Sequence, residues 1–269
     1  MTEPIRATKQ TVEEIFDGAA AQYDRVGPPL FERAGARLVE LLGVSSNTRV
    51  LDVGTGIGAA LIPAAQRGAS VTGIDVAEGM LAHAEQVAQK NKITNYQLLK
   101  MDAEHLEFPD DSFDIVACGF ALFLCPSMDT ALREMHRVLK TGGRVGVTVW
   151  GPAPFDPAWK ILSEQVRAYG IEVRMPNKVS YTEEEMRAML ERAGFIALET
   201  RIETLDAVYA SEDEWWRFQF TTGARAALAR LSGETRQKFR DEYLAKLRHL
   251  YRADGLHLPA PAMYVLAGK

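Results

Sequence analysis

The chain has 269 residues, of which 47% are hydrophobic and 25% charged, and its formal net charge is −5. This composition is typical of a globular domain that is long enough to bury a substantial core. The acidic balance argues against nucleic acid as a partner, because binding to a phosphate backbone depends on clustered Lys and Arg. No apolar run is long enough to cross a bilayer, and residues 1–6 lack the features of a secretory signal, so we expect a cytoplasmic protein without a membrane span.

In chain order, the first predicted elements are helices. Residues 11–42 carry apolar side chains at helical spacing, and Gly43 suits the position just after a helix. Strands and helices then alternate, with strands expected over 49–53, 70–75, 96–99, 113–119 and 144–150, and helices over 59–66, 78–90 and 128–139. This alternation predicts a doubly wound α/β fold with a mostly parallel sheet and helices on both faces.

The alternation ends after residue 150. Helices are expected over 157–169 and 183–193, the second opened by a capping box of Thr182 and Glu185, and a strand follows over 196–205. Ser211 and Glu214 form a second expected capping box, which opens a helical region that continues to about residue 253. The last strand is expected over 262–267. A connection of this length between two strands is best explained as a helical cap.

The cysteine and histidine residues give no sign of a metal site. Cys118 and Cys125, the only cysteines, lie in the apolar run 115–125, where we expect them to be core residues. The five histidines are scattered, without the short-spaced pairs that metal sites use. No metal is therefore expected.

The segment with the most chemical information is 50–58, with the sequence VLDVGTGIG. It reads as an apolar strand that enters a glycine-rich turn, and glycine permits both positive φ and the close approach of a ligand to the backbone. The next strand ends in Asp75, whose carboxylate could accept hydrogen bonds from both hydroxyls of a ribose. Together these features predict an adenosine site.

The glycine spacing alone leaves the cofactor open, because Gly54, Gly56 and Ala59 also fit the dinucleotide fingerprint. Asp52, just before the turn, favours a different ligand. Its carboxylate would repel a pyrophosphate but complement the ammonium and sulfonium charges of S-adenosylmethionine. The compressed spacing of Gly54, Gly56 and Gly58, and a last strand that follows a helical insertion, favour the same choice.

The order of the motifs resembles that of class I S-adenosylmethionine-dependent methyltransferases. Segment 50–58 is similar to their first motif, 73–81 to the second and 102–114 to the third, and 137–143 completes the series. Residues 21–24 add a likeness to the branch of ubiquinone and menaquinone C-methyltransferases and natural-product small-molecule methyltransferases. Pro63, Glu107 and Thr141 depart from the pattern, at positions that concern helix geometry and turn stiffness rather than cofactor binding.

The resemblance implies a Rossmann-like fold with a seven-stranded, mostly parallel sheet and an antiparallel last strand. It implies S-adenosyl-L-methionine as cofactor and S-adenosyl-L-homocysteine as product. The single domain 1–269 would then consist of N-terminal helices over the site (1–45), a cofactor-binding core (46–150), the remainder of the core (151–208 and 256–269) and an inserted helical cap (209–255).

Carried over by position, the resemblance also implies a set of cofactor contacts. Gly54 and Gly56 would lie beside the methionine part, Asp52 near its amine and Asp75 at the ribose. The complete set of expected cofactor-binding residues is Tyr23, Asp52, Gly54, Thr55, Gly56, Asp75, Val76, Met80, Asp102, Ala103 and Phe120.

The remaining contacts concern the two ends of the cofactor. Met80 would pack on the adenine face, while Asp102 and the backbone of Ala103 would bind the adenine edge. Phe120 would lie between cofactor and substrate, and Tyr23 would close over the methionine carboxylate. For Met80 and Phe120, ordinary core packing is the alternative.

Aromatic residues near the start of the expected cap predict a pocket for the methyl acceptor. With rings from the core they could line an apolar cavity, which would suit a quinone, polyketide or isoprenoid. The alternative is that these rings only attach the cap to the sheet. The expected substrate-pocket residues are Phe123, Trp150, Trp215, Trp216 and Tyr264.

No catalytic residue identifies itself. Methyl transfer is an in-line displacement in which positioning and desolvation supply much of the acceleration, so no obvious base is needed. Tyr23 and Asp24 lie where a base could act, and His249 and His257 flank the end of the cap, but none is assigned. The sequence predicts a monomeric or homodimeric methyltransferase of a small molecule. The alternatives are a non-methylating S-adenosylmethionine-binding descendant and, less favoured, an NAD-dependent oxidoreductase.

Overall fold

The structure is a computed structural model that describes residues 5–6, 8–23, 25–171, 173–174 and 177–269. At its centre is a sheet with the strand order β4-β3-β2-β5-β6-β10-β8, and β9 pairs with β10 off this path. Neighbouring strands from β4 to β6 are parallel, whereas β10 runs antiparallel to both β6 and β8. The predicted fold class is confirmed. The strands are β2 (Arg49–Val53), β3 (Ser70–Asp75), β4 (Tyr96–Lys100), β5 (Phe113–Gly119), β6 (Leu139–Trp150), β8 (Ile196–Tyr209) and β10 (Gly255–Gly268).

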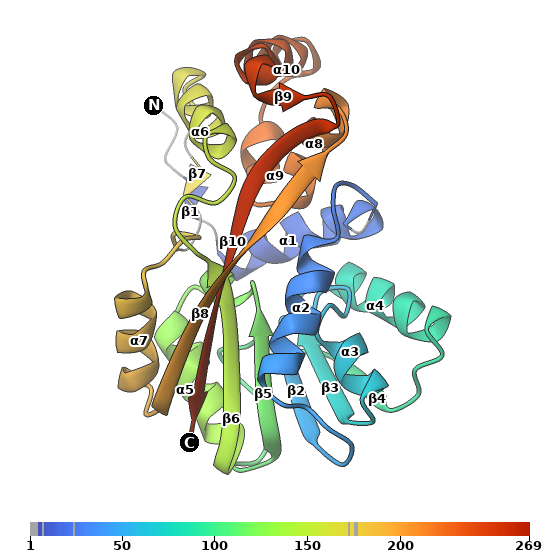
Figure 1. Cartoon of the computed structure of the whole chain (residues 1–269), viewed down its shortest axis with the longest axis vertical. Coiled ribbons are helices and arrows are strands. Elements are labelled where there is room, and N and C mark those ends of the chain that lie inside the picture. Colours follow the sequence, from blue (N-terminus) through green and yellow to red (C-terminus); the bar gives the residue numbers. More distant parts are fainter. Residues whose placement is uncertain (1–4, 7, 24, 172, 175–176) are drawn as a thin grey trace.

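Helices cover both faces of this sheet (Figure 1). α2 (Leu30–Leu41) and α3 (Leu61–Gln66) lie on one face, and α5 (Met128–Val138) and α7 (Glu183–Arg192) on the other. α4 (Glu78–Lys90) connects β3 to β4. The β6 residue Gly146 lets α2 approach closely, because a Cβ there would lie 2.7 Å from Leu38 Cδ1. Because the strands from β4 to β6 are parallel, their carboxyl ends lie at one edge of the sheet. This edge faces upward in Figure 1, toward α1 and the cap.

The N-terminal segment lies across this carboxyl edge. α1 (Lys9–Ala19) continues into the 3₁₀ turn η1 (Ala20–Gln22), and β1 (Ile5–Arg6) pairs with β7 (Val173–Arg174). A small separate core, which includes Ala19, Ile57 and Met80, joins this segment to the glycine-rich turn and α4. Asp17 Oδ1 also accepts a hydrogen bond from Gly79 N at 2.8 Å. The N-terminal helices are thus packed over the glycine-rich turn that follows β2.

The last two long strands extend beyond the sheet and carry the cap. They reach Tyr209 and start at Gly255, whereas the sequence predicted 196–205 and 262–267. The extension of β10 contains Pro259 and Pro261, and proline within a run disfavours a strand, so the sequence pattern underestimates the length of β10. The segment between them forms α8 (Glu212–Phe218), η3 (Gln219–Thr221), α9 (Ala224–Leu228), α10 (Gly233–Leu247), η4 (Arg248–Leu250) and β9 (Tyr251–Arg252).

α6 (Ala158–Ala168) lies beside the cap in Figure 1, although the sequence groups it with the core. Gln165 Nε2 donates a hydrogen bond of 2.9 Å to the Phe239 carbonyl of α10, and Lys246 Nζ donates to Gln165 Oε1 at 2.8 Å. The Tyr243 hydroxyl of α10 also donates to the Ala158 carbonyl at 3.1 Å. Because Gln165 is buried, these bonds make α6 and α10 one packed unit.

The two predicted capping boxes have different outcomes. At α7 the box is complete: Thr182 Oγ1 accepts from Glu185 N, and the Glu185 carboxylate accepts from Thr182 N. At α8, Ser211 Oγ accepts from Glu214 N, but the Glu214 carboxylate accepts from Ala210 N instead of Ser211 N. Both helices begin where the sequence placed them, and the second box is only half formed.

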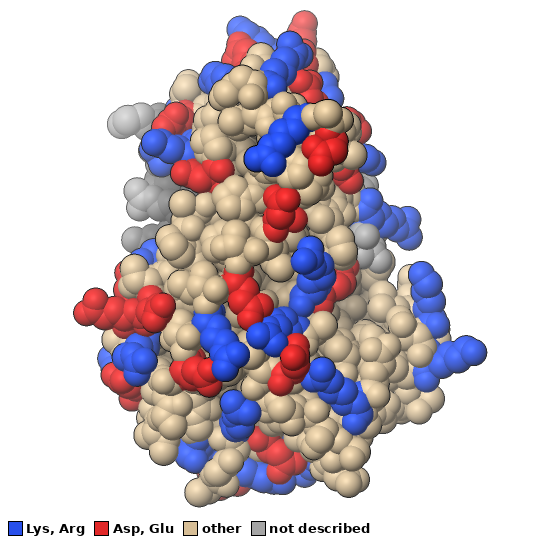
Figure 2. All heavy atoms as spheres, viewed as in Figure 1, with Lys and Arg blue, Asp and Glu red and all other residues tan. Residues whose placement is uncertain are grey.

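The surface and the helices agree with the composition. Figure 2 shows Lys and Arg interspersed with Asp and Glu on the visible face, with uncharged surface between them. Among the residues that the structure describes, no helix is long and apolar enough to cross a membrane. No group of three or more His, Cys, Asp or Glu in that part of the chain could hold a metal ion.

Candidate functional site

The glycine-rich turn after β2 has three glycines with positive φ, and two of them, Gly54 and Gly56, have different surroundings. Gly54 has φ +67°, and a Cβ there would lie 2.3 Å from Ala121 Cβ. Gly56 has φ +53°, and a Cβ there would have no atom within 4 Å. Gly54 therefore lets the turn pack against the segment after β5, whereas Gly56 leaves its backbone open to a ligand.

Asp52 and Asp75 anchor this turn from neighbouring strands. Asp52 is buried, and its Oδ2 accepts hydrogen bonds from Thr55 Oγ1 at 2.7 Å and from Leu61 N at 3.0 Å. Asp75 accepts from Gly56 N at 2.9 Å and from Ala77 N at 3.0 Å. Burial raises the pKa of Asp52 to about 6, and burial also raises the pKa of Asp75, against the opposing effect of its backbone hydrogen bonds.

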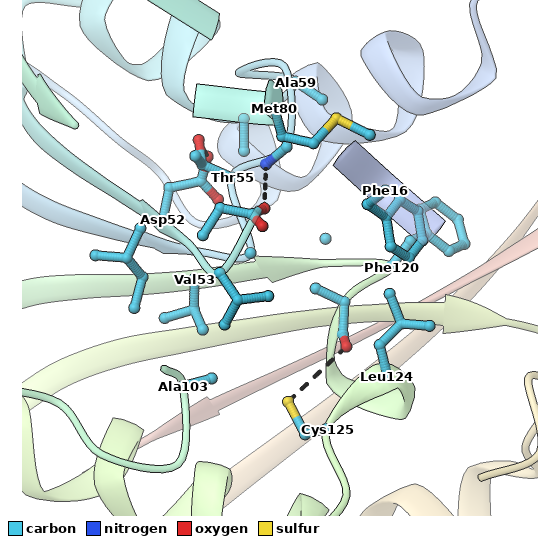
Figure 3. Close-up of a pocket in the computed structure, with 18 of the residues that line it drawn as sticks. Phe16, Asp52, Val53, Thr55, Ala59, Met80, Ala103, Phe120, Leu124 and Cys125 are labelled. Carbon is cyan, nitrogen blue, oxygen red and sulfur yellow. Dashed lines mark hydrogen bonds between the residues drawn. The ribbon is translucent and has the colours of Figure 1, made fainter. Parts of the chain in front are cut away.

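These residues border a cavity of about 130 Å³ at the carboxyl edge of the sheet, which we call the inner cavity. All the residues that the sequence predicted to bind the cofactor line it, from Tyr23 through Phe120. In the close-up of Figure 3, Asp52 and Thr55 lie on one side, Phe16 and Phe120 on the other, and Ala103 below. The structure brings the predicted set together, and the contact of each residue with a ligand stays a prediction.

The charges of the inner cavity suit a cationic nucleoside. Asp52, Asp75 and Asp102 contribute carboxylates, and of the described residues that line it only Lys9 is basic. The Lys9 ammonium forms an ion pair with Asp102 and lies 3.8 Å from the Glu104 carboxylate, so its charge is already compensated. Uncompensated negative charge beside an open glycine backbone fits the ammonium, sulfonium and ribose hydroxyls of S-adenosylmethionine and disfavours a diphosphate.

A second cavity of about 520 Å³, the outer cavity, adjoins the first one. Its walls come from the N-terminal helices, β6, α6 and the α8–α9 region, and they are mainly apolar. Both cavities share the side chains of Phe16, Tyr23, Phe31, Phe120 and Leu124. We call this set the junction.

Packed aromatic rings build the junction. The Phe31 ring stacks on Tyr23 with centroids 5.4 Å apart and meets Phe120 edge-on at 5.4 Å. The Phe120 ring lies 4.2 Å from that of Trp150. Phe120 also has φ +54°, which is unfavourable for a bulky residue, and its N donates to the Thr148 carbonyl at 2.9 Å. Backbone strain of this kind is concentrated at functional sites.

The predicted substrate-pocket residues divide into two groups. Phe123 and Trp150 line the outer cavity, whereas Trp215, Trp216 and Tyr264 line neither cavity. The reason is packing inside the cap and the sheet, where these three side chains are buried. Trp215 Nε1 donates to the Tyr243 hydroxyl at 2.8 Å within an aromatic cluster, and Tyr264 lies in the middle of β10. Trp215 thus joins the cap to Tyr209 of β8, Trp216 packs within the cap, and Tyr264 lies within the sheet.

The structure adds cavity residues that the sequence did not single out. Phe31 looked like a member of an amphipathic helix stripe, and Trp159 lies in an expected helix without a marked pattern. The cap contributes small residues that the sequence did not single out, and Phe218, one of the aromatic residues expected near the start of the cap, rather than its tryptophans. These cap residues are Phe218, Thr221, Thr222, Gly223, Ala224 and Ala227.

Candidates for a general base are scarce around both cavities. Within the described part of the chain, no histidine lines either cavity, and His257 instead lies 2.9 Å from the carboxylates of Asp206 and Asp254. Tyr23 lines both cavities, but burial raises the pKa of its hydroxyl well above the ordinary value. Asp24 lies outside the described residues.

Known proteins with the same motifs identify the family. The model of a methyltransferase domain family matches residues 51–147. The chain is 38% identical to aklanonic acid methyltransferase DauC of Streptomyces sp. over 52% of this chain and 65% of that protein, which is just under two thirds of its length. It is 33% identical to demethylmenaquinone methyltransferase of Staphylococcus aureus over 73% of this chain and 89% of that protein.

A solved structure agrees with the fold. The YcgJ protein of Bacillus subtilis matches with a TM-score of 0.61 and 23% identity, covering 88% of this chain and 98% of that one. The family model matches most of β2, the glycine-rich turn and the inner-cavity residues from Asp52 to Pro126. The chain therefore belongs to the class I S-adenosylmethionine-dependent methyltransferase family.

Proposed function

We propose that this protein transfers the methyl group of S-adenosylmethionine to a small apolar or aromatic organic acceptor. The observation that carries the proposal is the junction, where an acidic cavity and a mainly apolar one meet at Tyr23, Phe31 and Phe120. A methyl group presented at the junction faces the outer cavity, where the acceptor binds. The names of the relatives, which refer to aklanonic acid and demethylmenaquinone, agree with a small-molecule acceptor.

In the inner cavity, the chain's own carboxylates hold the cofactor. Gly56 N and Ala77 N already occupy part of the acceptor capacity of Asp75, and its remaining lone pairs accept from the ribose hydroxyls. Asp52 is fixed in orientation by Thr55 and holds the ammonium group. The bound cofactor supplies an electrophilic methyl group on a sulfonium centre.

At the junction, aromatic side chains shape the reaction space. Phe31 and Phe120 exclude water from the line between the methyl group and the acceptor, and aromatic rings stabilise a nearby positive charge. Holding the nucleophile about 3 to 3.5 Å from the methyl carbon supplies much of the acceleration. The packing of Phe120 against Trp150 keeps this geometry rigid.

The lining of the outer cavity narrows the acceptor class. Its described lining contains no carboxylate and no imidazole, and its ionisable residues are Tyr23 and Arg167. Since burial keeps the Tyr23 hydroxyl protonated, the described lining of the outer cavity offers no base. We infer an acceptor whose nucleophilic atom ionises without help, such as a carboxylic acid or an acidic phenol or enol.

We also propose that the protein acts in the cytoplasm as a monomer or homodimer, without a nucleic-acid partner. Cys118 and Cys125 are free, as expected of thiols in a reducing compartment. The net charge of −5 disfavours binding to a phosphate backbone. Light scattering of the purified protein would give the oligomeric state.

Transfer of a labelled methyl group tests the function. The protein would be incubated with methyl-labelled S-adenosylmethionine and a panel of aromatic acids, phenols, quinols and polar amines. We expect label in the ionisable aromatic acceptors, together with S-adenosylhomocysteine. Label only in polar acceptors would contradict the acceptor class. Saturable cofactor binding with no transfer to the panel or to a cell extract would favour the non-methylating alternative. The oxidoreductase alternative would need NADH binding, and family membership leaves it without support.

The pKa of Asp52 predicts how cofactor binding depends on pH. Because the folded protein holds this proton up to about pH 6, Asp52 is neutral below that pH and attracts an ammonium group less. The dissociation constant of S-adenosylhomocysteine is expected to be flat above pH 7 and to rise toward about tenfold per pH unit below pH 6. Calorimetry from pH 5 to 8 would measure this.

The stability of the ligand-free protein changes with pH in the opposite sense to its affinity for the cofactor. A carboxyl pKa that is higher in the folded than in the unfolded chain lowers stability as the pH rises from about 4 to about 6. The thermal shift caused by the ligand should therefore grow over this interval. The variant Asp52→Asn, which keeps the side-chain size, serves as control and should lose the affinity change below pH 6. An unchanged pH profile in that variant would exclude Asp52 as the responsible group.

A further inference from the structure

Thr148 is a buried hydroxyl-bearing residue without a structural partner. It lies on β6 in the sequence Val145-Gly146-Val147-Thr148-Val149, is 1% exposed and lines the inner cavity. Its Oγ1 has no hydrogen-bond partner among the described residues. A buried hydroxyl normally finds a partner, because an unsatisfied one destabilises the fold. Valine has the same shape, so packing alone gives no reason for threonine at this position.

The strand register shows what Thr148 faces. It is paired with Gly119 of β5, while Asp52 of β2 is paired with Ala117, two residues earlier on the same strand. Paired residues of a parallel sheet, and residues two apart on one strand, point to the same face. Asp52, Gly119 and Thr148 therefore face the same side, and a Cβ on Gly119 would meet no atom within 4 Å.

This open space has a definite border. At Gly146, two residues before Thr148 on the same face, a Cβ would lie 2.7 Å from Leu38, so α2 is in close contact with the sheet there. At Gly119 the contact is lost, and the space between Asp52 and Thr148 belongs to the inner cavity. Asp52 and Thr148 thus lie on opposite sides of one space above β5.

The polar side chains follow the order of the strands. Asp102 comes after β4, Asp75 ends β3, Asp52 lies on β2, and Thr148 lies on β6, beyond β5. In the proposed function, these carboxylates bind in turn the adenine, the ribose and the ammonium group of the cofactor. The next group along the methionine part is the carboxylate, which needs a donor. Thr148 lines only the inner cavity, so a contact with the acceptor is less favoured.

We propose that the Thr148 hydroxyl donates a hydrogen bond to the α-carboxylate of the methyl donor. This inference rests on the proposed function, and it extends the binding site to β6. The hydroxyl that has no partner in the protein alone gains one in the complex. Tyr23, expected at the same carboxylate, can bind its other oxygen, because a carboxylate has about four acceptor positions.

The test compares ligands with and without the amino-acid part. Calorimetry would measure S-adenosylhomocysteine and 5′-methylthioadenosine, which lacks that part, on the wild type, Thr148→Val and Thr148→Ser. We expect Thr148→Val to weaken S-adenosylhomocysteine binding about ten- to a hundredfold, as for loss of a hydrogen bond to a charged group. Binding of 5′-methylthioadenosine should stay within about twofold, and Thr148→Ser should restore most of the affinity.

A second measurement separates a binding role from a structural one. The ligand-free Thr148→Val protein should melt at the same temperature as the wild type or higher, because no hydrogen bond is lost. Unchanged affinity for S-adenosylhomocysteine would overturn the inference, and so would equal losses for both ligands or a change confined to the KM of the acceptor. A wild type that binds no S-adenosylhomocysteine would overturn the proposed function itself, which is a distinguishable result.

Discussion

Replacing Asp75 with alanine is expected to weaken S-adenosylmethionine binding by about a hundredfold or more, since two hydrogen bonds from ribose hydroxyls to a carboxylate are lost. The effect is large because the carboxylate is partly buried and already oriented by Gly56 N and Ala77 N. A water molecule in the shortened site would replace these bonds poorly. Calorimetric titration with S-adenosylhomocysteine would give the dissociation constant, and kcat/KM for the cofactor should fall in proportion.

The matched control for Asp75 is Asp17. Its carboxylate also accepts a hydrogen bond from a backbone N–H at the start of α4, that of Gly79, but it does not line the inner cavity. Asp17→Ala should therefore lower the melting temperature without a comparable loss of affinity. If both variants lost the same affinity, Asp75 would act by stabilising the start of α4 and not by binding the ribose.

Enlarging Ala224 to phenylalanine is expected to reduce kcat/KM for the acceptor about five- to a hundredfold, the range that follows from overpacking a closed space. Ala224 lines the outer cavity from α9 and is only partly buried, so the ring can enter the cavity without displacing core residues. The inner cavity does not include it. Binding of S-adenosylhomocysteine should therefore remain unchanged, and steady-state kinetics at saturating cofactor would measure the loss.

Ala226 provides the control on the same helix. It is partly buried like Ala224 but lines neither cavity. Ala226→Phe should leave the acceptor kinetics within about twofold of the wild type, as for surface substitutions away from a site. Equal losses of kcat/KM in both variants would mean that any bulky side chain on α9 disturbs the acceptor site. A full-activity Ala224→Phe enzyme would place the acceptor elsewhere and refute the assignment of the outer cavity.

The inner cavity illustrates what local sequence can predict. Asp52 lies near the end of one strand, Gly54 and Gly56 follow that strand, and Asp75 ends the next. Short-range sequence patterns are therefore enough to place these residues at strand ends. Once the alternation of elements indicates a parallel sheet, the strand ends must meet at one edge. For this reason the residues at these two strand ends line one cavity, and the other cofactor residues, which the resemblance to methyltransferases implies, line the same cavity.

The outer cavity illustrates the opposite case. Trp215 and Trp216 look like pocket residues in the sequence, and both are buried in the cap. Phe31 looks like an ordinary helix-stripe residue, and it lies at the junction. An apolar side chain has the same pattern whether it packs in a core or lines a cavity, because both positions exclude water. Whether the side chain lies in the core or lines a cavity depends on how tightly the opposing helices and strands pack against it.

The sequence by itself thus determined the fold class, the carboxyl edge and the methyl donor, because strand periodicity and glycine turns act over a few residues. Only the tertiary structure decided the acceptor space and the position of Thr148 at the inner cavity. That space is formed by α2, α6 and α9, which lie far apart in the chain, and its size depends on small gaps between them. Close packing makes such gaps depend on every contacting side chain, so no local pattern records them.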